Sequence, residues 1–240
     1  MIDTLGIPYT HAKQPEAQTL LNPDAAAPFD AIFFYDMPGI DFQMGGKAPN
    51  FPAPSPELKQ GLEALCESGK PLLFLHHALA GWPAWEKYAE IMGGRFHYMP
   101  ATLRNESYPD SGYILDADYE VEVAARDHPI CAGLPRRFTT CDELYQCPVF
   151  EEDVTPLFTA QPHYTDEDYF AAAPAATDMK INHRPANWSH PSASPLWGWE
   201  KTHKNSRIVT ILGGDGPAAY ANPYFRQLLK NAVQWLASPE

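Results

Sequence analysis

The chain has 240 residues, a length that fits one α/β domain spanning residues 1–240. Hydrophobic residues make up 45% of it, which is enough to bury a sizeable core. The formal net charge of -13 at pH 7 repels phosphate backbones and anionic lipids, so it argues against nucleic acids and membrane surfaces as partners.

The four cysteines, Cys66, Cys131, Cys141 and Cys147, contain no Cys-x-x-Cys pair. A disulfide framework is typical of small secreted chains, so we expect reduced thiols that mostly fill the core. No apolar run reaches the roughly 20 residues that span a bilayer, and no signal-peptide pattern is recognisable. These features predict a cytoplasmic protein.

The first regular elements alternate between strand and helix. Residues 30–36 form a short apolar run closed by a Met-Pro-Gly turn, which is typical of a buried parallel strand. Ser55 then caps a helix over 56–67, which has Pro56 at its first position and its apolar residues on one face. Residues 70–77 predict a second buried strand. Strand, helix and strand in this order predict a right-handed βαβ unit with parallel strands.

Four more regular elements follow along the chain. The stretch 83–92 predicts a helix ended by two glycines, and 112–124 alternates apolar and polar residues as a half-exposed strand does. Residues 207–213 predict the last buried strand, and 224–237 predict the closing amphipathic helix.

Two stretches are less regular. Residues 1–28 supply neither a convincing strand nor a helix, although an open parallel sheet usually begins with both, so we expect the N-terminal strand to be missing. Within the irregular region 159–204, residues 171–176 and 188–199 predict long loops, with a short strand on each side of Lys180. Long loops in a compact domain are often functional.

Polar residues follow three of the predicted strands at their carboxyl ends, where open α/β sheets bind ligands. These residues are Asp36, the pair His76-His77, and Asp215 in the glycine-rich turn 213–216. The turn lacks the spacing of a dinucleotide or phosphate loop, so it predicts no nucleotide site. Together the three strand ends predict one site at the same edge of the sheet.

His76 and His77 occupy a strand-to-turn elbow, where α/β enzymes display a nucleophile or base. Because successive strand residues point to opposite faces, we expect only one of the two to face the site. That histidine is a candidate general acid or base. The alternative is that one or both are packing histidines with satisfied hydrogen bonds.

The adjacent carboxylates Asp142 and Glu143 form a second candidate group, with Tyr145 beside them as a candidate substrate contact. The carboxylates are candidates for a general base, a metal ligand or contacts to sugar hydroxyl groups. A solvated turn that caps the next segment is the alternative. If a divalent metal is bound, His77 and Glu143 are its candidate ligands.

Further candidates for substrate binding join Asp36 and lie outside these motifs. Arg95 and His97 follow the helix predicted over 83–92, and Trp82 and Trp199 carry aromatic faces on which a sugar can stack. Core packing is the alternative for the tryptophans.

The same segments resemble the ThuA-like family of trehalose utilisation over nearly the whole chain. The Asp-Glu-Leu-Tyr motif at 142–145 and the His-Pro-Ile-x-x-Gly motif at 128–133 are specific in combination and weak singly. The other matching stretches are 29–36, 69–77, 85–96, 138–145, 207–215, 222–226 and 231–235.

The resemblance implies a flavodoxin-like α/β fold related to class I glutamine amidotransferases, with a mostly parallel sheet and helices on both faces. It also implies a link to sugar utilisation, in which family members accompany dehydrogenases that act on trehalose and related disaccharides through 3-keto sugars. Amidotransferase activity is not expected, because that chemistry needs a thiolate at the elbow. The elbow of this chain offers histidine and alanine, while Cys66 lies on the preceding predicted helix.

One departure from the family concerns the last strand, which ends in Leu-Gly-His-Asp in many members. This chain has Gly214 in place of that histidine. If the histidine is essential in the family, this chain is impaired or uses another group.

Two functional hypotheses follow. The first is a hydrolase, lyase or isomerase acting on an oxidised sugar, in which His76 or His77 is the acid and base. Asp142, Glu143 or Asp215 then orients that histidine or holds a divalent metal, the one cofactor that the sequence leaves open. The second is a non-catalytic sugar-binding or regulatory module on the same fold. Both have a small-molecule carbohydrate as partner, and both leave a homo-oligomer open.

Overall fold

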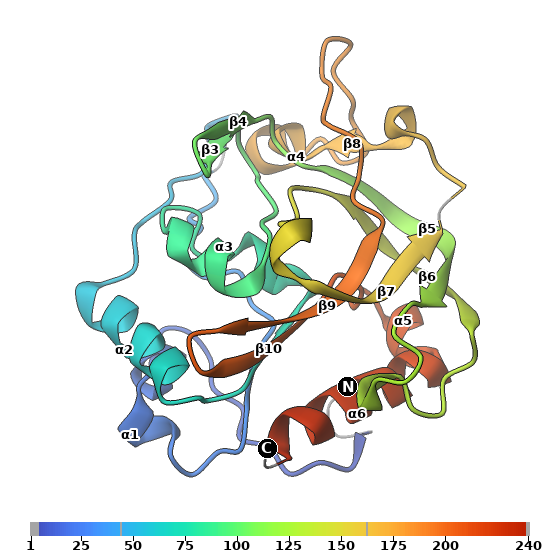
Figure 1. Cartoon of the computed structure of the whole chain (residues 1–240). Helices are drawn as coiled ribbons and strands as arrows, with labels where there is room; N and C mark the ends of the chain where they lie inside the picture. Colours follow the sequence, from blue (N-terminus) through green and yellow to red (C-terminus); the bar gives the residue numbers. More distant parts are fainter. Residues whose placement is uncertain (1–4, 44, 162, 239–240) are drawn as a thin grey trace.

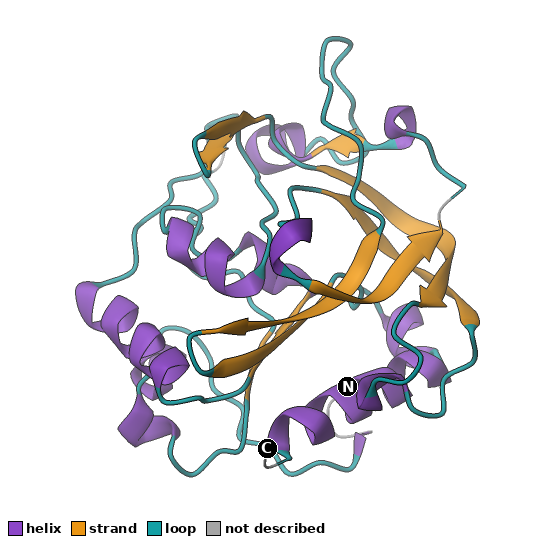
Figure 2. Cartoon of the chain, viewed as in Figure 1, coloured by secondary structure: helices purple, strands orange, loops and turns teal. Residues whose placement is uncertain are grey.

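A computed structural model describes residues 5–43, 45–161 and 163–238 (Figure 1). A curved sheet runs through the molecule, with helices packed beside it (Figure 2). The helices are α1 (Pro23–Ala26), α2 (Pro56–Glu67), α3 (Glu86–Met92), α4 (Ala172–Asp178), α5 (Pro217–Ala221) and α6 (Pro223–Ala237). The strands are β1 (Ile32–Phe34), β2 (Leu72–Leu75), β3 (Ala101–Leu103), β4 (Glu106–Tyr108), β5 (Gly112–Val123), β6 (Arg137–Gln146), β7 (Thr155–Gln161), β8 (Phe170–Ala171), β9 (Leu196–His203) and β10 (Ser206–Ile211).

The main sheet has the strand order β1-β2-β10-β9-β7-β5-β6, with β8 paired beside β5. β1, β2 and β10 run parallel, and Leu72 of β2 lies opposite both Ile32 and Ile208. From β10 onward each strand of that order pairs antiparallel with the next. For β9 and β10 the two-residue turn 204–205 requires the antiparallel arrangement, because parallel strands need a crossover of a dozen or more residues. The expected α/β fold is confirmed, and its sheet is mixed.

Helices cover both faces of the sheet, as expected. On one face, α2 and α3 bury Leu62 and Tyr88 in a cluster with Phe74 of β2. On the other face, α6 buries Phe225 in a cluster that includes Leu73 of the same strand. Leu73 and Phe74 point in opposite directions from neighbouring positions, which explains why every residue of β2 is apolar and buried.

The helices begin and end where local signals predict. The N–H of Leu58 donates a hydrogen bond to Oγ of Ser55 at 3.2 Å, and Pro56 occupies the first turn of α2. Gly93 ends α3 at φ 90, in the left-handed region that favours glycine. Among the described residues, no helix has both the length and the apolar character needed to cross a membrane.

Three stretches differ from the sequence prediction or refine it. Residues 171–176 were expected to form a loop, but most of them begin α4, since alanine favours a helix and Pro174 lies in the first turn, where its missing N–H costs nothing. The carboxylates at 142–143 lie inside β6, so the alternative of a solvated turn is wrong. In the described residues before β1, a 3₁₀ helix over 16–20 and the single turn α1 are present, and β1 is the edge of the sheet.

Candidate functional site

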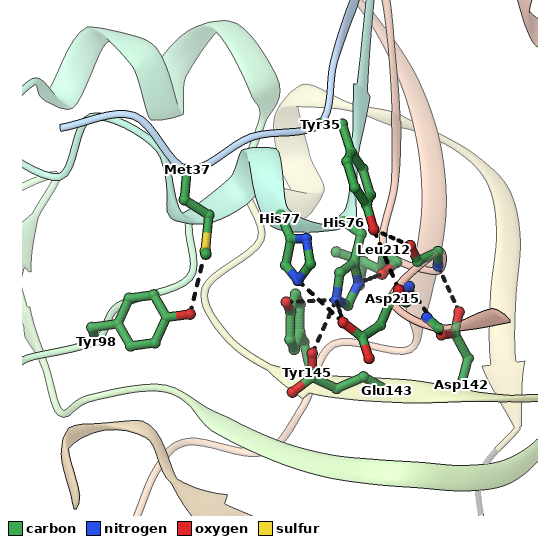
Figure 3. Close-up of polar contacts among 12 residues, drawn as sticks. Tyr35, Met37, His76, His77, Tyr98, Asp142, Glu143, Tyr145, Leu212 and Asp215 are labelled. Atoms are coloured by element: carbon green, nitrogen blue, oxygen red, sulfur yellow. Dashed lines mark hydrogen bonds and ion pairs between the residues drawn. The ribbon is translucent and has the colours of Figure 1, made fainter. Parts of the chain in front are cut away.

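Four side chains meet at the carboxyl ends of β2 and β10 (Figure 3). His76 and His77 follow β2, Asp215 follows β10, and Glu143 comes from β6. One nitrogen or oxygen atom from each of these residues lies within 4.8 Å of the other three. We name these four residues the cluster. The strand ends of β2 and β10 therefore share one site, and a third strand, β6, adds the carboxylate of Glu143.

Both histidines face the cluster, so the expectation that only one would do so is wrong. β2 ends at Leu75, and His76 adopts φ 44, in the left-handed region that residues other than glycine rarely occupy. The chain then turns through the 3₁₀ helix His76–Ala80. Strand alternation therefore stops before the pair, and the two imidazole rings lie 4.6 Å apart on the same side.

His76 is fully buried and has polar contacts at both ring nitrogens. Its Nδ1 lies 2.6 Å from the carbonyl oxygen of Leu212, which can only accept, so Nδ1 carries a proton. Its Nε2 lies 2.9 Å from the carboxylate of Glu143 and 2.8 Å from the hydroxyl of Tyr145. Burial lowers the pKa of His76, but hydrogen bonds to Asp215 and Glu143 outweigh this effect and raise the pKa to about 9.

His77 is the more accessible of the two histidines, with 27% of its side chain exposed. Its Nε2 lies 3.1 Å from Oδ1 of Asp215, and the same oxygen lies 3.6 Å from Nε2 of His76. Hydrogen bonds from His76 and His77 hold the pKa of Asp215 well below its usual range. Because both side chains reach solvent, His77 and Asp215 are the members of the cluster that are best placed to meet a ligand.

Asp142 supports the cluster from behind and does not join it. Its Oδ2 accepts a hydrogen bond from the N–H of Gly214 at 2.6 Å, and its Oδ1 accepts one from the N–H of Asp215 at 3.1 Å. Burial raises the pKa of Asp142, while these hydrogen bonds act in the opposite direction. Asp142 therefore fixes the backbone that carries Asp215, and of the two adjacent carboxylates only Glu143 reaches the histidines.

Three residues that the sequence analysis missed lie near the cluster (Figure 3). The ring of Tyr35 lies 5.1 Å from the ring of His77, and its hydroxyl donates to the carbonyl oxygen of Gly214 at 2.9 Å. The hydroxyl of Tyr98 donates to the sulfur of Met37 at 3.3 Å. Tyr35 was within reach of sequence reasoning, because it is the next-to-last residue of the strand predicted over 30–36, at the same edge of the sheet as the histidines.

Three predicted substrate contacts do not face the cluster. Asp36 is exposed, and its negative charge acts on Tyr88 in the hydrophobic cluster of α2 and α3. Trp199 is 0% exposed, and its indole N–H donates to the last carbonyl of α3 at 2.8 Å. Trp82 is buried in the same hydrophobic cluster as Tyr88. Both tryptophans therefore pack in the core, as the alternative interpretation holds.

Arg95 and His97 are enclosed by the protein. The guanidinium of Arg95 donates to the carbonyl oxygens of Trp82, Pro83 and Trp85, so it fixes the turn before α3. His97 is 4% exposed, and neither ring nitrogen has a hydrogen-bond partner in the part of the chain that the structure describes. Burial lowers the pKa of His97 to about 3, so its ring is neutral near pH 7. Neither side chain is open to a ligand from solvent.

Comparison with known proteins places these features in a family. The model of the ThuA family, described as trehalose utilisation, matches residues 17–236. A ThuA-like protein from Parabacteroides merdae is similar in structure, with 16% identity, a TM-score of 0.60, and coverage of 88% of this chain and 71% of that chain. One from Bacteroides uniformis is similar with 16% identity, a TM-score of 0.59, and coverage of 91% and 74%.

A cytoplasmic protein from Salmonella typhimurium is also similar, with 13% identity, a TM-score of 0.52, and coverage of 97% of this chain and 77% of that chain. At these identities the likeness shows the fold, which is the flavodoxin-like α/β fold expected from the sequence. No curated protein matches the chain significantly.

Proposed function

The chain belongs to the ThuA family of trehalose utilisation, and from this premise we propose that it is an enzyme of carbohydrate utilisation whose reaction takes place at the cluster. The observation that carries the proposal is the meeting of two histidines and two carboxylates within 4.8 Å. The pKa of His76 is raised and that of Asp215 is lowered, and such shifts are typical of active sites. Tyr35 and Tyr98 offer aromatic faces near the cluster for a sugar ring.

We propose an oxidised disaccharide such as 3-ketotrehalose as the substrate. A ketone at C3 of the sugar acidifies the neighbouring C2–H bond, so that a base near neutral pKa can remove the proton. The electron pair then forms the C1–C2 double bond and expels the glycosidic oxygen, which takes up a proton and leaves as free glucose. Addition of water across the double bond completes a net hydrolysis.

The cluster offers two ways to promote these proton transfers. His77, with Asp215 at 3.1 Å, is placed to act directly as base and then as acid. A divalent metal would instead supply Lewis-acid stabilisation of the negative charge that develops on the ketone oxygen. In both cases Asp142 holds Asp215 in place through the backbone N–H groups.

Proton NMR of 3-ketotrehalose incubated with the protein tests the proposal. We expect free glucose to appear, and we expect His77→Ala to reduce turnover by at least about 100-fold. His128→Ala is the matched control, since His128 pairs with the carboxylate of Glu200 at 3.2 Å and lies outside the cluster. Undiminished turnover in folded His77→Ala, or an unchanged sugar spectrum with and without divalent metal, contradicts the proposal.

A non-catalytic sugar-binding module is the second candidate function. It is favoured by Gly214, which stands where many family members carry a histidine. In this case the NMR signals of the sugar broaden on addition of the folded protein, but no product appears. The same experiment therefore separates the two candidates.

We also propose a cytoplasmic location and no glutamine amidotransferase activity. All four cysteines are unpaired, which suits a reducing compartment. Burial raises the pKa of Cys66 and of Cys147 to about 12, so neither supplies the reactive thiolate that a glutaminase needs.

A further inference from the structure

We propose that the cluster binds one divalent transition-metal ion through Nε2 of His76, Nε2 of His77 and one carboxylate oxygen each of Glu143 and Asp215. The inference rests on the proposed function in that both place the chemistry at the cluster. The ion can be measured without any substrate, so the two proposals fail or succeed separately.

The hydrogen-bonding pattern of His76 is the first argument. Since Nδ1–H donates to the carbonyl oxygen of Leu212 at 2.6 Å, the neutral ring has its lone pair on Nε2. That lone pair points at the carboxylate of Glu143, 2.9 Å away, and Asp215 lies 3.6 Å away. The two carboxylates favour a positive charge at this nitrogen, and without a metal a proton on Nε2 supplies it. A divalent ion that replaces this proton binds the nitrogen and both carboxylates. A backbone carbonyl that holds the far N–H is also the usual support of a metal-bound histidine.

Charge and donor type are the second argument. Two neutral imidazoles and two carboxylates carry a total charge that a divalent cation balances. The donor set of two nitrogens and two oxygens suits zinc, manganese, iron, cobalt or nickel. Calcium and magnesium prefer oxygen ligands alone, and none of the four donors is a thiolate, which copper(I) prefers.

The distances leave little adjustment to make. Donor atoms on one ion at about 2.0–2.1 Å lie no more than roughly 4.2 Å apart, and those of the cluster lie within 4.8 Å of one another. Small side-chain rotations therefore bring them into the coordination range. The side chains of Glu143, His77 and Asp215 are 11%, 27% and 35% exposed, so they have room for these rotations and leave a path for the ion.

The groups behind the donors are rigid, which is the third argument. Asp142 holds the backbone of Asp215 through the N–H groups of Gly214 and Asp215. The backbone of His76 is strained at φ 44, and this strain turns both imidazoles to the same side. Fixed second-layer contacts of this kind lower the cost of assembling a metal site.

Isothermal titration of the chelator-treated full chain with Zn²⁺, and separately with Mn²⁺, tests the proposal. We expect one ion of at least one of the two metals per chain, and at least about tenfold weaker binding in His77→Ala and in Glu143→Gln. His128→Ala is the control, because its histidine–carboxylate pair with Glu200 lies outside the cluster. Circular dichroism shows that each variant is folded, and Asp215→Asn replaces any variant that is not.

The outcomes are distinct. No binding of either metal, or equal affinity in the wild type and the folded cluster variants, overturns the metal proposal. If 3-ketotrehalose is nevertheless converted by metal-free protein, the proposed function stands with His77 and Asp215 as the proton-transfer pair. If one ion binds and is lost in the cluster variants but no sugar is converted, the metal site stands and the proposed substrate is wrong.

Discussion

One backbone angle decides which residues can reach the site. His76 lies at φ 44, and without that conformation His76 and His77 would point to opposite sides of the strand. A residue other than glycine in such a conformation costs on the order of 1–3 kcal/mol and persists only where other contacts hold it. The contacts of the imidazole with Leu212, Glu143 and Tyr145 do so here. The interactions that build the site therefore also offset its strain.

Gly214 leads to a prediction at the same scale, because the resemblance to the family implies a histidine at this position. Its φ is 117, and an added Cβ would lie 3.0 Å from the hydroxyl of Tyr220 and 3.1 Å from the side chain of Leu75. We expect Gly214→His to lower the free energy of unfolding by about 1–3 kcal/mol, as measured by urea denaturation. Gly216→His is the matched control, since its φ is -110 and an added Cβ meets nothing within 4 Å.

Equal stability of the two variants would show that the backbone at position 214 adapts to a side chain. The expected result means that a histidine at position 214 lowers the stability, because the loop before α5 has a conformation that only glycine adopts easily.

Among the elements, β6 divides its acidic motif between two tasks. Side chains two residues apart share a face of a strand, so Glu143 and Tyr145 both reach Nε2 of His76. Asp142 points to the opposite face and holds the backbone of Asp215. The division was predictable once the motif was assigned to a strand, but the neighbouring carboxylates favoured a turn as the alternative.

Helix α2 supports a prediction about local capping. The Oγ of Ser55 accepts the N–H of Leu58, which otherwise has no partner within the first turn. We expect Ser55→Ala to lower the free energy of unfolding by about 1 kcal/mol, as measured by urea denaturation. Ser107→Ala, at an exposed position of β4, is the control and should leave the stability unchanged. A loss no larger than that of the control would mean that solvent replaces the cap.

At the scale of the whole molecule, the curl of the sheet assembles the site. β6 is an edge strand at the end of the order opposite to β1 and β2, yet its Glu143 contacts His76 at the end of β2 (Figure 1). A bulge in β5 between Ile114 and Ala117 shifts its register with β6, and bulges of this kind bend and twist a sheet. The site therefore depends on the shape of the sheet as well as on its strand order.

The buried His97 makes the stability of the molecule depend on pH. Burial, with Arg95 and His190 acting in the same direction, lowers its pKa to about 3 from the usual 6.5. Between these pH values the unfolded chain binds a proton that the folded chain does not. The contribution of His97 to the free energy of unfolding is therefore complete above pH 6.5 and decreases as the pH falls from 6.5 toward 3. The contribution of one such group is a slope of about 1.4 kcal/mol per pH unit.

We expect His97→Phe to reduce this slope between pH 6 and pH 4 by on the order of 1 kcal/mol per pH unit. Phenylalanine cannot be protonated, and it also removes two buried nitrogens that have no hydrogen-bond partner in the described ranges. Urea denaturation at several pH values measures the slope, with His183→Phe as a control at an exposed position. A slope equal to that of the wild type would show that His97 is protonated in the folded protein.

The sequence by itself determined the local features. Apolar runs, caps and glycine ends predicted β1, β2, β5, β10, α2, α3 and α6, because the signals for these elements lie within a few neighbouring residues. The same reading placed His76, His77 and Asp215 at strand ends, where the structure brings them together. It missed β6, β7 and β9, whose partners are set by pairing across the sheet.

Only the tertiary structure decided which of the candidate residues meet. Glu143 lies 67 residues from His76 in the sequence, and no spacing rule connects them. Trp199 and Arg95 carry the right chemistry for a sugar, but packing against α3 and its preceding turn encloses them. The composition of the site depends on sheet curvature, on one strained backbone angle and on burial, all of which arise from contacts between distant parts of the chain.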